Sequence, residues 1–85
     1  MASKKRILIV EDHQLLREGL KTMIAAYDAL EIAGEAEDGL EAIKVVRKLV
    51  PDIVLLDLSM PRMGGISVIK EVKSLFPDIK ILALT

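Results

Sequence analysis

The strongest constraint on the fold is a set of short apolar runs that are rich in branched side chains. Three of them occupy residues 7–10, 53–56 and 81–84. Runs of this length without polar alternation are typical of strands that are covered on both faces, as in a parallel sheet. A fourth segment, residues 30–36, alternates more and contains Gly34 and two glutamates, so it fits an edge of that sheet.

Helical patterns lie between these runs, with apolar residues at intervals of three or four. The predicted apolar stripes are Leu16, Leu20, Met23 and Ile24; Ala42, Val46 and Leu49; and Ile69, Val72, Leu75 and Phe76. Asp38 before Gly39 predicts an N-cap for the second helix, while Pro51 and Pro77 are expected to end the second and third. Strands and helices therefore alternate, which predicts right-handed crossovers and an α/β fold. We expect a flavodoxin-like doubly wound parallel sheet with the strand order 2-1-3-4, numbered along the chain.

The composition narrows the class of protein. Aromatic residues make up 2% of the chain and cysteine is absent, so the predicted core is aliphatic, without disulfides or thiolate metal ligands. The 12 basic and 13 acidic residues leave no concentrated positive face, which argues against direct nucleic-acid binding by this segment. The apolar runs are far shorter than the roughly 20 residues that span a bilayer, and residues 1–6 do not lead into a secretory signal. We therefore expect a cytoplasmic chain that does not enter a membrane.

Acidic residues follow two of the predicted strands at the point where each strand ends. Glu11 and Asp12 come directly after the first strand, and Asp57 comes directly after the third. In the expected strand order these two strands are neighbours, at the crevice where the winding of the sheet reverses and ligands bind. Neighbouring strands lie roughly 4.7 to 4.9 Å apart, so the three carboxylates are expected to meet in one crevice. Such a cluster repels itself and raises the pKa of at least one member unless a cation neutralises it.

A divalent cation would remove this repulsion. Magnesium prefers oxygen ligands and often keeps positions for waters and phosphate oxygens, so Asp57 could attack phosphorus as a carboxylate nucleophile and form an acyl phosphate. The alternative for a single acidic residue is structural, with Asp12 as a helix cap and Asp57 at the start of a loop. A flavin mononucleotide site also occurs at this point of such sheets, but it favours a neutral loop, and the charges of Glu11 and Asp12 would repel its phosphate.

The residues at these two strand ends resemble a known signature. Residues 7–12, residues 54–61 and Gly65 are similar to the motifs of two-component response-regulator receiver domains. Three further segments resemble the receivers of LuxR-type transcription factors, namely residues 13–20, 34–36 and 60–66. The resemblance covers essentially the whole chain, so residues 1–85 are interpreted as a partial receiver domain that lacks the final helix, strand and helix of the family.

The resemblance implies roles for individual residues. Asp57 is the implied phosphoacceptor, and Glu11 and Asp12 are the implied ligands of Mg²⁺. The main-chain carbonyl of Ser59 would complete the protein ligands. Thr85 matches the switch hydroxyl that contacts the phosphoryl group.

Other positions are expected to serve the structure. Gly65 is expected to allow a backbone conformation that other residues avoid, and His13 to occupy a surface position in the first turn of a helix. Lys80 does not match the family's phosphoryl-contacting lysine, because it precedes the tip of the fourth strand. By the resemblance, that lysine and the aromatic residue that moves with the switch threonine belong to the lacking portion.

The implied function is a signalling module in which a sensor histidine kinase donates a phosphoryl group to Asp57 and the modified domain regulates transcriptional output. One alternative is a metal-dependent phosphatase or phosphotransferase with an aspartyl intermediate, although the sequence has Ser59 where a second acid would be useful. Another is an inactive or oligomerising fragment. Residues 79–84 would form an unpaired apolar edge, so we expect the isolated chain to self-associate, exchange elements or fold only in part.

Overall fold

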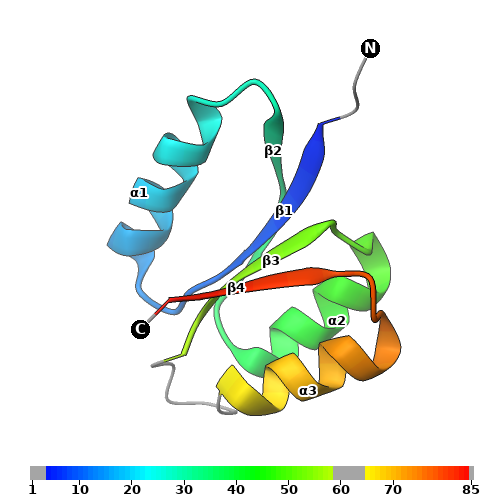
Figure 1. Ribbon diagram of the computed structural model, residues 1–85. Helices are drawn as coiled ribbons and strands as arrows, with labels where there is room; N and C mark the ends of the chain where they lie inside the picture. The colour runs from blue at the N-terminus through cyan, green and yellow to red at the C-terminus, as the bar shows by residue number, and fades with distance from the viewer. Residues whose placement is uncertain (1–3, 59–64, 85) are drawn as a thin grey trace.

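The computed structural model describes residues 4–58 and 65–84. The elements along the chain are β1 (Lys5–Val10), α1 (Gln14–Ala25), β2 (Leu30–Ala36), α2 (Gly39–Leu49), β3 (Ile53–Asp57), α3 (Gly65–Leu75) and β4 (Lys80–Leu84). The four strands are parallel and lie in the order β2-β1-β3-β4. Helix α1 covers one face of the sheet, while α2 and α3 lie together on the other (Figure 1). None of the described helices combines the length and apolar character needed to cross a membrane.

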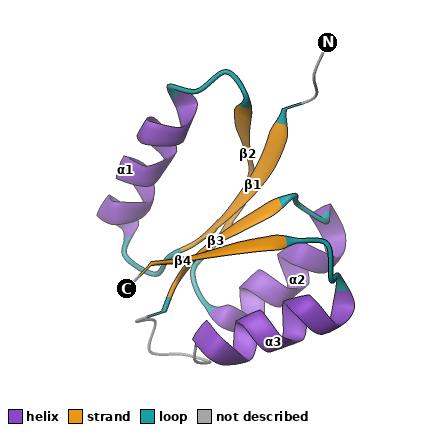
Figure 2. Ribbon diagram, viewed as in Figure 1, coloured by secondary structure: helices purple, strands orange, loops and turns teal. Residues whose placement is uncertain are grey.

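The predicted α/β class, the doubly wound sheet and the strand order 2-1-3-4 are confirmed. Strand β2 forms one edge, as its alternating sequence indicated, and β1 and β3 lie side by side in the centre. Because these two strands are parallel and adjacent, their carboxyl ends lie on the same side of the sheet (Figure 2). The acidic residues lie at these carboxyl ends.

The aliphatic core lies on both faces of the sheet. On the α2 and α3 side the buried sheet residues are Leu8, Val10, Ala36, Val54 and Leu56, and the buried helix residues are Ala42, Val46, Val68 and Val72. On the α1 side, Ile7 and Ile9 of β1 are buried together with Ile24 of the helix. Buried β1 therefore contributes side chains to both halves of the core, as expected for a central parallel strand.

The predicted stripe of α1 was wrong at two positions. Leu16 and Met23 are 48% and 65% exposed, and the face toward the sheet carries Arg17, Leu20 and Ile24 instead. These three residues share one helix face because they are spaced by three and four positions. Leu16 and Met23 each precede one of them by one residue, a rotation of about 100° around the helix axis, so they turn away from the sheet.

The helix ends follow from local hydrogen bonding. Asp38 is the N-cap of α2, as predicted, and its Oδ1 accepts a hydrogen bond from Glu41 N at 2.8 Å. His13 was expected inside the first turn of α1 but is its N-cap, where its Nδ1 accepts from Leu16 N at 3.3 Å. The alternative role of Asp12 as the cap is therefore taken by its neighbour. Helix α2 ends at Leu49. Its C-cap Val50 has a left-handed φ of 44°, which breaks the helix before Pro51.

The expectation that Gly65 is needed for a backbone conformation that other residues avoid was wrong. No described glycine has a positive φ, and Gly65 begins α3 with an ordinary helical backbone. A Cβ at this position would instead lie 2.6 Å from Leu58 Cδ2 and 3.0 Å from Leu58 Cα. The absence of a side chain therefore allows α3 to begin close to the residue that follows β3.

Gly65→Ala is expected to lower the free energy of unfolding by about 1 to 3 kcal/mol, because the added methyl group overpacks the contact with Leu58. Gly19→Ala is the matched control, since nothing lies within 4 Å of the Cβ that it would add to α1. This control should raise the free energy of unfolding by roughly 0.5 to 1 kcal/mol through helix propensity. Urea unfolding followed by circular dichroism measures both, and equal stabilisation by the two changes would contradict the close approach at Gly65.

Candidate metal centre

Strands β1 and β3 bring three carboxylates together at the edge where both strands end. Asp57 is the last residue of β3, and Glu11 follows the last residue of β1. Val10 pairs with Leu56 in the parallel ladder, so Glu11 and Asp57 occupy the next position on neighbouring strands. Side-chain oxygens of Glu11, Asp12 and Asp57 all lie within 4.8 Å of one another. The meeting of the three carboxylates that the strand order predicted is therefore present.

Burial makes this cluster electrostatically costly. Glu11 is 1% exposed and Asp57 is 8% exposed, whereas Asp12 faces solvent. Burial raises the pKa of the Glu11 carboxyl above its ordinary value, and the nearby carboxyls of Asp12 and Asp57 raise this pKa further. The hydrogen bond from His13 N–H to Glu11 acts in the opposite direction but does not offset these effects.

The two oxygens of Glu11 have different surroundings. Oε2 accepts the hydrogen bond from His13 N at 3.0 Å. Oε1 is buried and has no hydrogen-bond partner among the described residues. Leaving a buried acceptor without a donor costs about 1 to 3 kcal/mol, and more for a charged group. A cation at Oε1 would remove this cost.

The donor set fits a hard divalent cation. Three carboxylates supply only oxygen atoms, and such ligands suit Mg²⁺ or Ca²⁺ better than the softer metals that cysteine selects. Each carboxylate has two oxygens, so Asp57 can contact a cation with one oxygen and a reacting phosphorus with the other. The arrangement can therefore hold a metal ion next to a carboxylate nucleophile.

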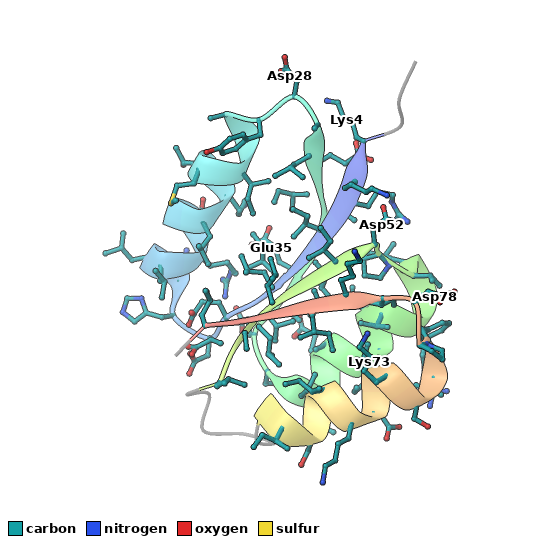
Figure 3. The ribbon with its side chains drawn as sticks, viewed as in Figure 1. Lys4, Asp28, Glu35, Asp52, Lys73 and Asp78 are labelled. Carbon is teal, nitrogen blue, oxygen red and sulfur yellow. The ribbon has the colours of Figure 1, made fainter. Side chains whose placement is uncertain are left out.

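One buried residue beside this cluster was not recognised in the sequence. Arg17 of α1 donates from Nη1 to the main-chain oxygen of Glu11 at 2.8 Å and from Nε to Glu35 Oε1 at 3.0 Å. Glu35 belongs to β2, and its side chain meets Arg17 of α1 (Figure 3). A signal for Arg17 was available, because a charged residue three positions before Leu20 and seven before Ile24 shares their buried helix face.

Some predicted positions lie outside the described residues. These are Ser59, whose carbonyl was expected to bind the metal, and Thr85, the expected switch hydroxyl. Met60 and Pro61, which belong to the resembling segment, also fall there. Lys80 pairs with Ile53 at the start of β3, whereas Asp57 ends that strand, so it lies away from the acidic cluster.

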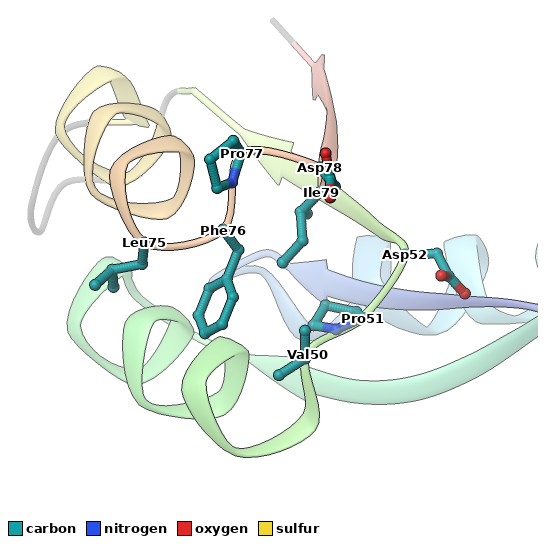
Figure 4. A pocket seen from close by; sticks show the side chains of 8 residues that line it. All are labelled: Val50, Pro51, Asp52, Leu75, Phe76, Pro77, Asp78 and Ile79. Carbon is teal, nitrogen blue, oxygen red and sulfur yellow. The ribbon is translucent and has the colours of Figure 1, made fainter.

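A pocket lies at the other end of the strands, where β3 and β4 begin. This shallow pocket of about 280 Å³ is lined by residues 50–52 and 75–79, which connect α2 to β3 and α3 to β4 (Figure 4). Both connections carry the Pro-Asp-Ile sequence, and Pro51, Phe76 and Ile79 supply apolar lining. Because β3 runs from this pocket to Asp57, the length of the strand separates the pocket from the acidic cluster.

Known proteins resemble this chain in sequence. Residues 7–85 match the response regulator receiver domain family. The protein named "Uncharacterized transcriptional regulatory protein YhcZ" from Bacillus subtilis is 48% identical over 58 residues, which cover 68% of this chain and 27% of that protein. A protein-glutamate methylesterase/protein-glutamine glutaminase from Pyrococcus horikoshii is 48% identical over 63 residues, which cover 74% of this chain and 17% of that protein.

A solved structure extends the comparison to the fold. The two-component response regulator of the LuxR family from Aurantimonas sp. SI85-9A1 superposes with a TM-score of 0.90 and 34% identity, over 95% of this chain and 58% of that one. The chain spans less than a third of the length of the two curated relatives. The family match, the strand order and the acidic cluster agree, and the chain belongs to the response regulator receiver domains, a family that accepts phosphate on an aspartate.

Proposed function

We propose that Asp57 is the phosphoacceptor of this chain and that Glu11 and Asp12 hold Mg²⁺ beside it. The observation that carries the proposal is the meeting of the three carboxylates within 4.8 Å at the ends of β1 and β3. The buried Glu11 Oε1, which has no hydrogen-bond partner among the described residues, supports a cation at this place. By resemblance to the family, the carbonyl of Ser59 would be a further ligand and Thr85 would contact the transferred group.

The proposed reaction transfers a phosphoryl group from a phosphohistidine. A carboxylate oxygen of Asp57 attacks phosphorus, a P–O bond forms as the P–N bond breaks, and the imidazole nitrogen keeps the electron pair of the broken bond. Bound Mg²⁺ would neutralise charge on the phosphoryl oxygens. The contribution of the chain is orientation, because β3 holds Asp57 at its end and β1 places Glu11 next to it.

The donor and the output are proposed from the family. Receiver domains of response regulators are phosphorylated by sensor histidine kinases, and we propose such a kinase as the donor here. The YhcZ name and the LuxR-family structure favour a transcriptional output, although the name of the P. horikoshii relative describes an esterase. We further propose that residues 1–85 are the first part of a cytoplasmic receiver domain that neither turns over a separate substrate nor binds nucleic acid directly.

The test is binding of beryllofluoride, which mimics a phosphoryl group on a carboxylate. With Mg²⁺ present, we expect a saturable bound signal in ¹⁹F NMR for the wild-type chain and no bound signal for Asp57→Asn. The reason is that the amide of asparagine cannot donate the anionic oxygen that beryllium requires. Steady hydrolysis of phosphomonoesters that depends on Asp57 would favour a phosphatase instead. Mg²⁺ binding without beryllofluoride binding would favour an inactive fragment.

We also propose that the 85-residue polypeptide self-associates through β4. This strand pairs with β3 on one side and is the edge of the described sheet, so backbone groups on its other side are open to pairing. Leu82 of β4 is 57% exposed and lies beside Leu55 of β3, on the sheet face where α1 packs mainly against β1 and β2. An apolar edge next to a partly bare face favours association with a second copy.

Leu82→Lys is expected to shift the chain toward monomer, because a charge on the edge strand opposes pairing with a second copy. Sedimentation velocity over about a hundredfold range of concentration measures the monomer fraction. Ile66→Lys is the matched control, since Ile66 is also a large apolar residue and is 66% exposed but lies on α3. A wild-type chain that stays monomeric throughout this range, with a melting transition independent of concentration, would contradict the proposal.

A further inference from the structure

Arg17 connects three segments that surround the acidic cluster. This buried side chain reaches from α1 to the main-chain oxygen of Glu11 at 2.8 Å. The same guanidinium donates to Glu35 Oε1 at 3.0 Å and to Glu37 Oε1 at 3.4 Å, at and just beyond the end of β2. The ends of β1 and β2 are thus tied to one another through one residue of α1.

These contacts fix Glu11 at several atoms. Its N–H donates to Ala36 O at 3.0 Å, and its main-chain oxygen accepts from Arg17. Its Oε2 accepts from His13 N at 3.0 Å. Only Oε1 is left without a partner among the described residues. The peptide group and one carboxylate oxygen are held, so the direction of the remaining oxygen is defined.

We propose that Arg17 is a positioning residue for the metal site. Arg17 bridges the main-chain carbonyl of Glu11 to the carboxylates of Glu35 and Glu37. It thereby sets the position of the backbone from which the Glu11 carboxylate reaches the cation. This inference rests on the proposed metal site, and it assigns to Arg17 no contact with the metal or with the phosphoryl group. Groups that orient a metal ligand through hydrogen bonds commonly affect metal affinity about 10- to 100-fold when they are changed.

The geometry of arginine, and not its charge alone, suits this role. A guanidinium presents several donors in a rigid plane, whereas a lysine ammonium is a single flexible donor group. Lys21 illustrates the difference, because it contacts Glu35 Oε2 at 3.0 Å and Glu18 Oε1 at 3.4 Å from the same helix. No described contact joins Lys21 to Glu11, so Lys21 shares the ion-pair network without holding the metal ligand.

The test compares the affinities of the 85-residue chain for Mg²⁺ and for Ca²⁺ by isothermal titration calorimetry. Mg²⁺ requires nearly ideal octahedral geometry, whereas Ca²⁺ tolerates irregular ligands. A loosened Glu11 should therefore weaken Mg²⁺ binding more than Ca²⁺ binding. For Arg17→Met we expect the Kd for Mg²⁺ to rise about tenfold, and the Kd for Ca²⁺ to rise by less than about threefold. Lys21→Met is the control and should leave the ratio of the two affinities unchanged.

Arg17→Lys separates geometry from charge and also serves if Arg17→Met does not fold. We expect this variant to lose Mg²⁺ selectivity as Arg17→Met does, although it keeps the positive charge. Full selectivity in Arg17→Lys would overturn the inference, because charge would then suffice. Equal weakening of both cations would also overturn it, since that pattern indicates a smaller folded fraction. Unchanged binding of both would also overturn it, because Arg17 would then have no effect on the site, and tighter binding of both would show that Arg17 acts only by repelling cations.

Failure of the proposed function gives a different result. In that case the wild-type chain would not bind either cation in a way that depends on Asp57, and Asp57→Asn would match it. If the wild-type chain binds Mg²⁺ through Asp57 and Arg17→Met and Arg17→Lys retain its selectivity, only the positioning role of Arg17 is wrong.

Discussion

Leu8→Ala is expected to remove most of the free energy of unfolding of the isolated chain at room temperature. Leu8 lies in the central strand β1, is fully buried, and pairs in register with Val54 of β3. Truncation of a buried leucine to alanine costs about 3 to 5 kcal/mol when the cavity cannot collapse. Small domains are commonly stable by only about 5 kcal/mol. Urea unfolding followed by circular dichroism measures the loss, which should remove most of the folded baseline.

Leu15→Ala is the control for this prediction. It is the same chemical change in α1, but Leu15 is 77% exposed, so its free energy of unfolding should change by less than about 0.5 kcal/mol. If Leu8→Ala and Leu15→Ala had the same urea midpoint, β1 would not be the buried centre of the sheet.

Asp57→Asn is expected to stabilise the metal-free chain and to remove its stabilisation by Mg²⁺. Like charges within 4.8 Å repel by about 3 kcal/mol at an effective dielectric constant near 20, so removal of one charge should gain about 1 to 3 kcal/mol. The wild-type chain should instead gain about 2.7 kcal/mol when Mg²⁺ is present at a hundred times its Kd. Thermal melts with Mg²⁺ and with EDTA measure both effects.

Asp78→Asn is the matched control, because Asp78 lies in the connection before β4, at the end of the strands away from the acidic cluster (Figure 4). This variant should keep the wild-type response to Mg²⁺. The same Mg²⁺ stabilisation in Asp57→Asn as in the wild type would show that any bound metal lies elsewhere.

The raised pKa of Glu11 makes the stability of the metal-free chain depend on pH in a defined direction. Burial and the neighbouring acids raise the folded-state pKa of Glu11 above its unfolded value of 4.5. A proton therefore favours the folded chain, and this stabilisation is full below the unfolded pKa and is lost as pH rises through the folded pKa. Without metal, the urea midpoint of the wild type should fall relative to that of Glu11→Gln as pH rises through the folded-state pKa of Glu11. Saturating Mg²⁺ should reverse the shift, because it binds the ionised carboxylate.

The sequence predicted the sheet well because strand burial has a direct signature. The apolar runs at residues 7–10 and 53–56 lie in β1 and β3. Strand β1 is buried on both faces, and β3 is buried on the α2 and α3 face and partly buried on the other, so neither strand shows polar alternation. The expected meeting of Glu11, Asp12 and Asp57 required only the strand order, because register and parallel direction then place both strand ends at one edge.

The sequence predicted side-chain detail less well. The helical stripe of α1 was assigned from apolar residues alone, which overlooked that Arg17 is buried by its hydrogen bonds to Glu11 and Glu35. The reason for Gly65 was also not predictable, since its contact with Leu58 depends on how α3 returns to the end of β3. The burial of Arg17 and the close approach at Gly65 both depend on tertiary contacts, whereas the burial of a strand can be predicted from its own residues.

The most direct test of the metal site is a titration with Mn²⁺ followed by ¹⁵N–¹H NMR. Mn²⁺ takes the same carboxylate and water ligands as Mg²⁺ and broadens amide signals near it. One site at Glu11, Asp12 and Asp57 predicts that signals of residues 10–13 and 56–58 disappear first and together, and that excess Mg²⁺ restores them. Broadening that begins around Glu18 or Glu31 while the neighbours of Asp57 stay sharp would contradict the account.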